Sequence, residues 1–231
     1  MSKMEGSDKK KDKIKQDNEL TTFTVQSAFG ATNGNIYVNT NTADKPSKEQ
    51  IIEEAFKAHS QGDISKALKS YRYFISQGFK DPKVFSNYGI ILMNQGKSKE
   101  AEIYFLNAIQ LKPDFIEVYC NIGALLKDEG KLKKALYYLK KALEIKPNFA
   151  EAISNIGNIY TAQGNIQKAE KCHKKAIKIK PNFVEAYYNL AGIYREIGDL
   201  EKAERLIREV IKLNPDYIYA YSMMGDVLKA S

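Results

Sequence analysis

Cysteine is scarce in this sequence, and Cys120 and Cys172 are the only two among 231 residues. They stand far apart, and neither belongs to a CxxC pair or to a cysteine–histidine cluster with metal-ligand spacing. A disulfide-stapled domain or a structural zinc site needs more cysteines than this. We therefore expect both thiols to be reduced, and we expect neither a metal site nor another cofactor.

Long apolar segments are also missing. The sequence has no run of about 18 apolar residues, the minimum for a membrane-spanning helix. Residues 1–20 are charged throughout and lack the apolar centre of a secretory signal. These two absences predict a cytoplasmic protein that does not insert into a membrane.

The familiar catalytic motifs are missing as well. The sequence holds no GxxxxGK[ST], HExxH, GxSxG or GxGxxG pattern. His59 and His173 are the only histidines, and His173 stands at a helix-packing position, which favours a structural role over that of a catalytic base. We find no catalytic constellation and predict that the protein is not an enzyme.

What the sequence does contain is a repeat of 34 residues. Glycine returns at this step at Gly62, Gly96, Gly130, Gly164 and Gly198. Alanine returns at the same step at Ala67, Ala101, Ala135, Ala169 and Ala203. Proline returns at Pro113, Pro147, Pro181 and Pro215. A fixed period of this length indicates stacked supersecondary units.

Each unit has the pattern of two helices. In residues 150–183, Ile153, Ile156 and Tyr160 are spaced by three and four, which places them on one helical face. Gly164 then ends the first helix, and Pro181 follows the second. The segments 114–117, 148–151 and 182–185 read Asp/Asn-Phe-x-Glu and predict capping boxes, so we interpret their glutamates as helix caps.

Small residues mark the places where the two helices of a unit cross. They are Gly89, Gly123, Gly157, Ala191 and Gly225 on the first helices, and Ala101, Ala135, Ala169 and Ala203 on the second. Larger side chains there would hold the helices apart. A single helical hairpin cannot bury its apolar face alone, so we expect the units to stack.

This order of small, aromatic and proline positions resembles the tetratricopeptide repeat (TPR), over about residues 48–231. The resemblance implies an all-α fold, an α-solenoid in which helix-turn-helix repeats form a right-handed superhelix. We predict a disordered charged tail at 1–18 and a Thr/Asn-rich segment at 19–47 with the composition of a β-hairpin. The array follows with a degenerate unit at 48–81, units at 82–115, 116–149, 150–183 and 184–217, and a half repeat at 218–231.

Polar residues on the first helices provide the candidate binding site, because the resemblance implies that these helices line a concave groove. Asparagine returns at the 34-residue step at Asn87, Asn121, Asn155 and Asn189. Each amide can both donate and accept, so the row can bind the backbone of an extended peptide, as in the asparagine ladder of peptide-binding TPR proteins. Asparagine is also common at this position of the repeat without a known ligand. Further candidates for contact with the peptide are Asn158, Lys127, Arg195 and Tyr188.

The function predicted from these features is a non-catalytic scaffold for an unidentified protein or peptide partner. An alternative follows from the order of tail, Thr/Asn-rich segment and array, which is similar to TPR proteins of marine picocyanobacteria. In such relatives the array can precede a glycosyltransferase, sulfotransferase or oxygenase domain. The chain would then present substrates to a separate catalytic subunit, or be a remnant of such an enzyme.

Two surfaces suggest further contacts. The net charge is +8, and the excess lies in residues 116–149 and 150–183, whose second helices are rich in lysine. Such a ridge can meet nucleic acid or an acidic membrane, but no nucleic-acid motif accompanies it, so we favour a solvated face and expect no nucleic-acid partner. The segment 218–230 is apolar, and we expect Tyr221, Met224 and Leu228 to be exposed there and to allow self-association.

Overall fold

The computed structural model describes residues 45–230, and this part of the chain contains eleven α-helices. They are α1 (Lys48–Ser60), α2 (Ile64–Ser76), α3 (Pro82–Asn94), α4 (Ser98–Leu111), α5 (Ile116–Asp128), α6 (Leu132–Ile145), α7 (Ala150–Ala162), α8 (Ile166–Ile179), α9 (Val184–Glu196), α10 (Leu200–Leu213) and α11 (Ile218–Ala230). Within the described range there is no strand, which confirms the predicted all-α class. The predictions for residues 1–18 and 19–44 lie outside the described residues.

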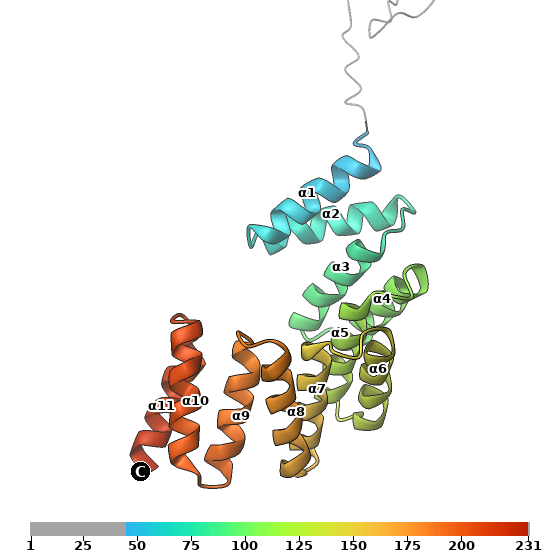
Figure 1. Ribbon diagram of the computed structural model, residues 1–231. Helices are drawn as coiled ribbons and strands as arrows, with labels where there is room; N and C mark the ends of the chain where they lie inside the picture. The colour runs from blue at the N-terminus through green and yellow to red at the C-terminus, as the bar shows by residue number, and fades with distance from the viewer. Residues whose placement is uncertain (1–44, 231) are drawn as a thin grey trace, which may run out of the picture. The chain divides into compact units, whose positions relative to one another are not determined.

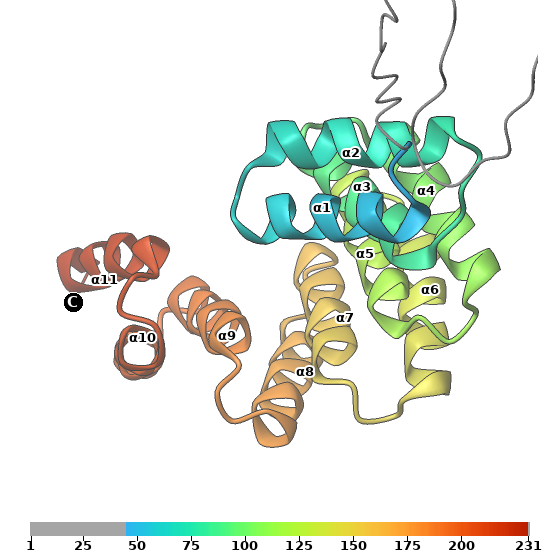
Figure 2. The same cartoon turned by 90° about the horizontal axis from the view of Figure 1, so that it is seen from above.

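The helices pack in chain order (Figure 1). Antiparallel hairpins form between α3 and α4, α5 and α6, α7 and α8, and α9 and α10. Each second helix also contacts the next first helix, and the first helices α3, α5, α7, α9 and α11 contact one another in succession. Figure 2 shows the same succession from above. Every unit therefore packs mainly on its neighbours in sequence, which is the contact pattern of a solenoid.

The chain divides by its internal contacts into Met1–Gln50 and Ile51–Ser231. The first of these units contributes only residues 45–50 to the described part. There Ser47 and Gln50 form a reciprocal capping box at the start of α1. The backbone N–H of Ser47 donates to Gln50 Oε1 at 2.7 Å, and the N–H of Gln50 donates to Ser47 Oγ at 3.2 Å.

The turn inside each hairpin depends on a glycine with a left-handed backbone. Gly130, for example, follows α5 with a φ of 72°. A residue with a Cβ rarely adopts this conformation, so glycine recurs at this step. Several second helices then begin with a side-chain cap, such as Asp199, whose Oδ1 accepts from the N–H of Lys202 at 3.1 Å.

The predicted close crossing of the two helices in a unit is confirmed by the space around the helical glycines. A Cβ placed on Gly123 of α5 would lie 2.6 Å from Leu139 Cγ of α6. Gly89 faces Phe105 and Gly157 faces His173 in the same way, at 2.7 and 2.8 Å. The large side chain of the second helix thus packs directly on the backbone of the first.

One sequence interpretation needs correction. The predicted capping boxes at 114–117, 148–151 and 182–185 do not form, because α5, α7 and α9 begin one residue later and have Phe115, Phe149 and Phe183 at the N-cap without a side-chain hydrogen bond. The glutamates are therefore not caps. The unit 48–81, predicted as a degenerate repeat of the array, contains the two helices α1 and α2.

Candidate functional site

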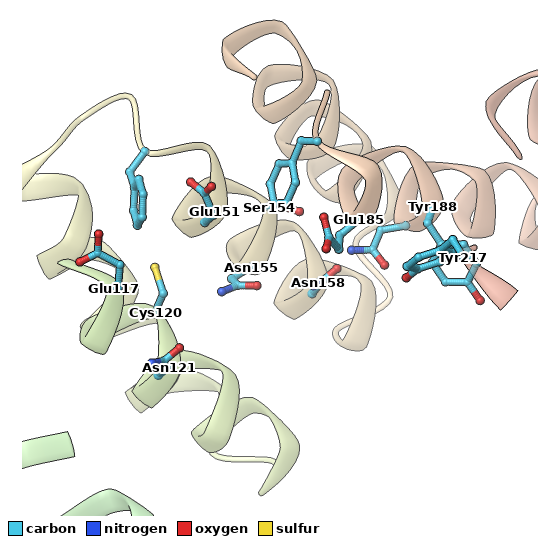
Figure 3. Close-up of a pocket in the computed structure, with 13 residues that line it drawn as sticks. Glu117, Cys120, Asn121, Glu151, Ser154, Asn155, Asn158, Glu185, Tyr188 and Tyr217 are labelled. Carbon is cyan, nitrogen blue, oxygen red and sulfur yellow. The ribbon is translucent and has the colours of Figure 1, made fainter. Parts of the chain in front are cut away.

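A groove runs across the first helices α5, α7 and α9 and the loops that precede α7, α9 and α11. Its volume is about 500 Å³. Figure 3 shows side chains from these three helices pointing into it, together with Tyr217 from the loop before α11. Since α5, α7 and α9 belong to successive units, equivalent positions line the groove at the 34-residue step. The lining is therefore best described row by row.

The first row is the asparagine row. Asn121, Asn155 and Asn189 line the groove, and all three side chains are half-buried. Within residues 45–230 none of the three makes a hydrogen bond. Asn158, one turn further along α7, also lines the groove (Figure 3). The amide groups of these residues are available to a ligand.

Asn87 differs from the other members of the predicted row. Its Nδ2 donates to Tyr71 Oη of α2 at 3.3 Å, and it is not among the groove residues. Tyr71 is fully buried, and its hydroxyl group also lies 3.1 Å from His59 Nδ1, so the two contacts together satisfy it. The structure thus brings three of the four predicted asparagines together and places Asn87 in a contact with the preceding hairpin.

The second row consists of carboxylates. Glu117, Glu151 and Glu185 stand in the first turns of α5, α7 and α9, and all three line the groove. Lys180 Nζ lies 2.6 Å from Glu151 Oε1. Burial alone would raise the pKa of Glu151, but the bond to Lys180, a backbone hydrogen bond and nearby lysine charge outweigh it and lower that pKa. Among the described residues, the groove lining contains no lysine or arginine.

The third row is aromatic and was missed by the sequence analysis. Phe149, Phe183 and Tyr217 line the groove just ahead of α7, α9 and α11. Lys146 Nζ lies 5.3 Å from the centroid of the Phe149 ring, and Lys180 Nζ lies 4.7 Å from that of Phe183. The signal was present in the sequence, because an aromatic residue stands two positions after each recurring proline.

The fourth row varies in size and contains Cys120, Ser154 and Tyr188. Tyr188 packs on Tyr217 with 5.3 Å between ring centroids, so it forms part of an aromatic end of the groove (Figure 3). Cys120 is a free, buried thiol. Burial first, and then the charges of Glu151 and Glu117, raise its pKa to about 12, so it is an un-ionised small side chain rather than a nucleophile.

The two predicted cationic contacts lie outside this lining. Lys127 Nζ is 2.8 Å from Asp128 Oδ1. Arg195, at the end of α9, is exposed and places Nη1 at 3.0 Å from Asp226 Oδ2 of α11. Both side chains are thus engaged in ion pairs near the C-terminal ends of their helices.

Ser154 and His173 form the pair that most resembles a catalytic arrangement. Ser154 Oγ lies 3.1 Å from His173 Nδ1, while His173 Nε2 is buried without a hydrogen-bond partner. An activated serine needs a base that a third group orients, and nothing performs that role here. Burial lowers the pKa of His173 to about 4, and both side chains are almost completely buried. The pair is a packing contact, as predicted for His173.

The remaining predicted surfaces lie away from the groove. In α11, Tyr221 is 51% exposed and Leu228 is 56% exposed, whereas Met224 is half-buried. The lysines of α6 and α8 are mostly exposed, and some of them join carboxylates on their own helix, as in Lys141–Glu144 and Lys174–Glu170. None of the helices within residues 45–230 has both the length and the apolar character needed to cross a bilayer.

Comparison with known families identifies the repeat. One tetratricopeptide repeat model matches residues 116–149, 150–183 and 184–217, and a second model of the same description matches residues 82–115. Together they cover more than half of the 231 residues. No curated protein matches the chain.

Solved structures share the fold. A thermophilic TPR protein of Thermus thermophilus is 18% identical, with a TM-score of 0.69 over 79% of this chain and 100% of its own. MamA from Desulfovibrio magneticus is 20% identical, with a TM-score of 0.58 over 74% and 96%. A TPR protein of Parabacteroides merdae is 24% identical, with a TM-score of 0.59 over 79% and 73%. At these identities the likeness establishes the all-α solenoid fold alone.

Proposed function

Because the chain belongs to the tetratricopeptide repeat family, we propose that it is a non-catalytic scaffold whose groove binds an extended segment of a partner protein. Repeats of this family form protein–protein interaction scaffolds, and proteins with this fold are generally non-catalytic. The partner is thus a protein or peptide, and its binding site is the groove across α5, α7 and α9.

The observation that carries this proposal is the asparagine row. Asn121, Asn155 and Asn189 present amides from three neighbouring helices into one groove and use none of them within the described fold. Each amide can accept from a peptide N–H and donate to a peptide carbonyl. A polypeptide lying across the row would satisfy its own backbone groups while exposing its side chains to the other rows.

The carboxylate and aromatic rows indicate which side chains the bound segment should carry. Glu151 is paired with Lys180, but Glu117 and Glu185 have no ion-pair partner within the described residues, and their charges favour a neutral or basic segment over an acidic one. Phe149, Phe183 and Tyr217 provide apolar surface on which side chains of the segment can pack. Rigid first helices hold all of these groups in place before binding, which reduces the entropy lost on association.

The test is affinity capture from native lysate with the full-length chain as bait. The groove variant carries Asn121→Ala, Asn155→Ala and Asn189→Ala. We expect it to recover the specific partner at less than about a tenth of the wild-type amount, since each lost hydrogen bond costs roughly 1 kcal/mol. Circular dichroism should show the same helical content as the wild type.

A matched control removes three amides elsewhere. Asn94, Gln110 and Gln167 are exposed and do not line the groove, so their triple replacement by alanine should leave capture unchanged. Equal recovery of the partner by the groove variant and the wild type would rule out the role of the asparagines.

The alternative function uses the same groove. As a substrate-presenting accessory or remnant of a TPR-fused glycosyltransferase, sulfotransferase or oxygenase, the chain would hold a substrate segment for a separate catalytic subunit. This alternative, the likeness to picocyanobacterial arrays and the cytoplasmic location all stay predictions. Identification of such a catalytic subunit among the captured proteins, with its recovery dependent on the asparagine row, would favour the accessory function.

A further inference from the structure

Lys180 shows what the carboxylate and aromatic rows bind when they act together. Its Nζ lies 2.6 Å from Glu151 Oε1 and 4.7 Å from the centroid of the Phe183 ring. The carboxylate supplies a charge-assisted hydrogen bond, and the ring face attracts the same cation. The chain itself thus places an ammonium group between a glutamate of one unit and the aromatic residue that precedes the next first helix.

One unit further along the chain, the lysine is missing. Glu185 and Tyr217 follow Glu151 and Phe183 by 34 residues, but the position of Lys180 is now occupied by Asn214. The Asn214 side chain is used locally, since its Oδ1 accepts from the N–H of Asp216 at 3.1 Å. Within residues 45–230, Glu185 has no hydrogen-bond or ion-pair partner. This unit therefore has the carboxylate of Glu185 and the ring of Tyr217, but it has no lysine at the position equivalent to Lys180.

A second aromatic ring, that of Tyr188, packs on Tyr217 at this position. Tyr188 lies against Tyr217 at 5.3 Å between centroids and an interplanar angle of 63°, and both rings are half-buried. Burial first, and then the charge of Glu185, raise the pKa of Tyr217. All three residues line the groove, and Figure 3 shows Tyr188 and Tyr217 side by side, with Glu185 apart from the two rings.

We infer that Glu185, Tyr188 and Tyr217 form a subsite for the ammonium group of a lysine side chain carried by the partner segment. The inference rests on the proposed function, because the lysine arrives on a peptide that lies along the asparagine row. Lysine is the expected occupant because the chain's own Lys180 fills the corresponding position one unit earlier. The subsite specifies where along the groove the positive charge of the partner lies.

The test uses two blocked Gly-Ser peptides that differ only at the central residue, which is lysine in one and glutamine in the other. Each is titrated into the isotope-labelled full-length chain and followed by NMR at the side-chain amides of Asn155 and Asn189 and at the Tyr217 ring. We expect the lysine peptide to bind about tenfold more tightly and to shift Tyr217 as well as the asparagines. The glutamine peptide should shift the asparagines alone.

Two variants of the subsite and one control complete the experiment. Glu185→Gln removes the carboxylate, and Asn214→Lys supplies the chain's own lysine, which the fold already accepts at Lys112, Lys146 and Lys180. Both should reduce the preference for the lysine peptide to less than about twofold. The control Glu196→Gln removes an exposed carboxylate of the same helix that does not line the groove, and it should keep the preference.

The outcomes separate this inference from the proposed function. Equal binding of the two peptides to the wild type, with shifts at the asparagines, overturns the subsite and leaves groove binding intact. An equal loss of preference in Glu185→Gln and Glu196→Gln also overturns it, since general charge attraction then explains the effect. No shift at the asparagines with either peptide contradicts both the proposed function and the subsite.

Discussion

His173 occupies a core position that is apolar in the hairpins α3–α4, α5–α6 and α9–α10. Phe105, Leu139 and Ile207 fill it at the 34-residue step, and all are fully buried. His173 packs on Gly157 as Leu139 packs on Gly123. An imidazole there needs to stay neutral, because its Nε2 has no partner and a charge would be desolvated.

This residue makes stability depend on pH in a predictable direction. Burial lowers the pKa of His173 from 6.5 to about 4. Between these values the unfolded chain binds a proton that the folded chain does not, so stability is fully present above pH 6.5 and is lost as the pH falls to 4. The loss should be about 3 kcal/mol relative to His173→Leu, in which no group titrates.

The measurement is urea unfolding of the wild type and His173→Leu at pH 7.5 and at pH 4. Carboxylates titrate in both proteins, so the difference between their unfolding free energies isolates the histidine. A difference that is the same at both pH values would show that His173 titrates normally in the folded protein.

At the scale of the element, the close approach of two helices decides whether a glycine can be replaced. A Cβ on Gly123 would lie 2.6 Å from Leu139 Cγ, whereas a Cβ on Gly225 of α11 would meet nothing within 4 Å. Gly123→Ala should therefore lower stability by about 1–3 kcal/mol through overpacking. Gly225→Ala should raise it by up to about 1 kcal/mol through helix propensity. Thermal unfolding of both variants gives the comparison, and destabilisation by Gly225→Ala would contradict the argument.

The recurring glycines are one reason why the helical hairpins could be predicted from the sequence. The 34-residue step, the turn glycines and the small crossing residues each report a local requirement of a helical hairpin, so the hairpins are predictable. The first residue of each first helix cannot be predicted in the same way, because the sequence allows either Asp114 or Phe115 to be the N-cap. The structure places the aromatic residue at the N-cap, where its ring faces a lysine such as Lys112 at 5.1 Å.

The candidate site is predictable only where it follows the repeat. Spacing alone identifies Asn121, Asn155 and Asn189 as equivalent, and all three line the groove. Spacing cannot show that Asn87 bonds to Tyr71, because that contact depends on the packing of α3 against α2 of the degenerate unit. Nor can it show that the glutamates face the groove, since their side-chain direction follows from the helix start.

At the scale of the whole molecule, function depends on neighbouring units rather than on any one of them. The groove needs α5, α7 and α9 and the loop before α11, so no single hairpin contains the site. Contacts between successive first helices hold these parts together. Stability in such an array is approximately a sum of repeat terms and nearest-neighbour interface terms, so the interfaces between these units are the ones on which the groove depends.

The exposed face of α11 can be compared with the equivalent face of α5. Tyr119 of α5 and Tyr221 of α11 are equivalent, and their hydroxyls donate to the carbonyls of Pro113 and Pro215 at 3.0 and 2.9 Å. The Tyr119 ring lies 6.4 Å from that of Tyr138 on α6. Tyr221 itself is 51% exposed. A second copy of the chain, offering its own α11, would cover this apolar face.

We therefore predict that the chain self-associates through α11. The mass measured by light scattering should rise with concentration for the wild type and stay at one chain for Tyr221→Lys/Leu228→Lys, because two buried charges would have to be desolvated in the interface. Ser222→Lys/Ala230→Lys adds the same charge to exposed positions of the same helix and should still associate. A wild type that remains at the mass of one chain at high concentration would contradict the prediction. Equal disruption by both pairs would attribute association to net charge instead of to the apolar face.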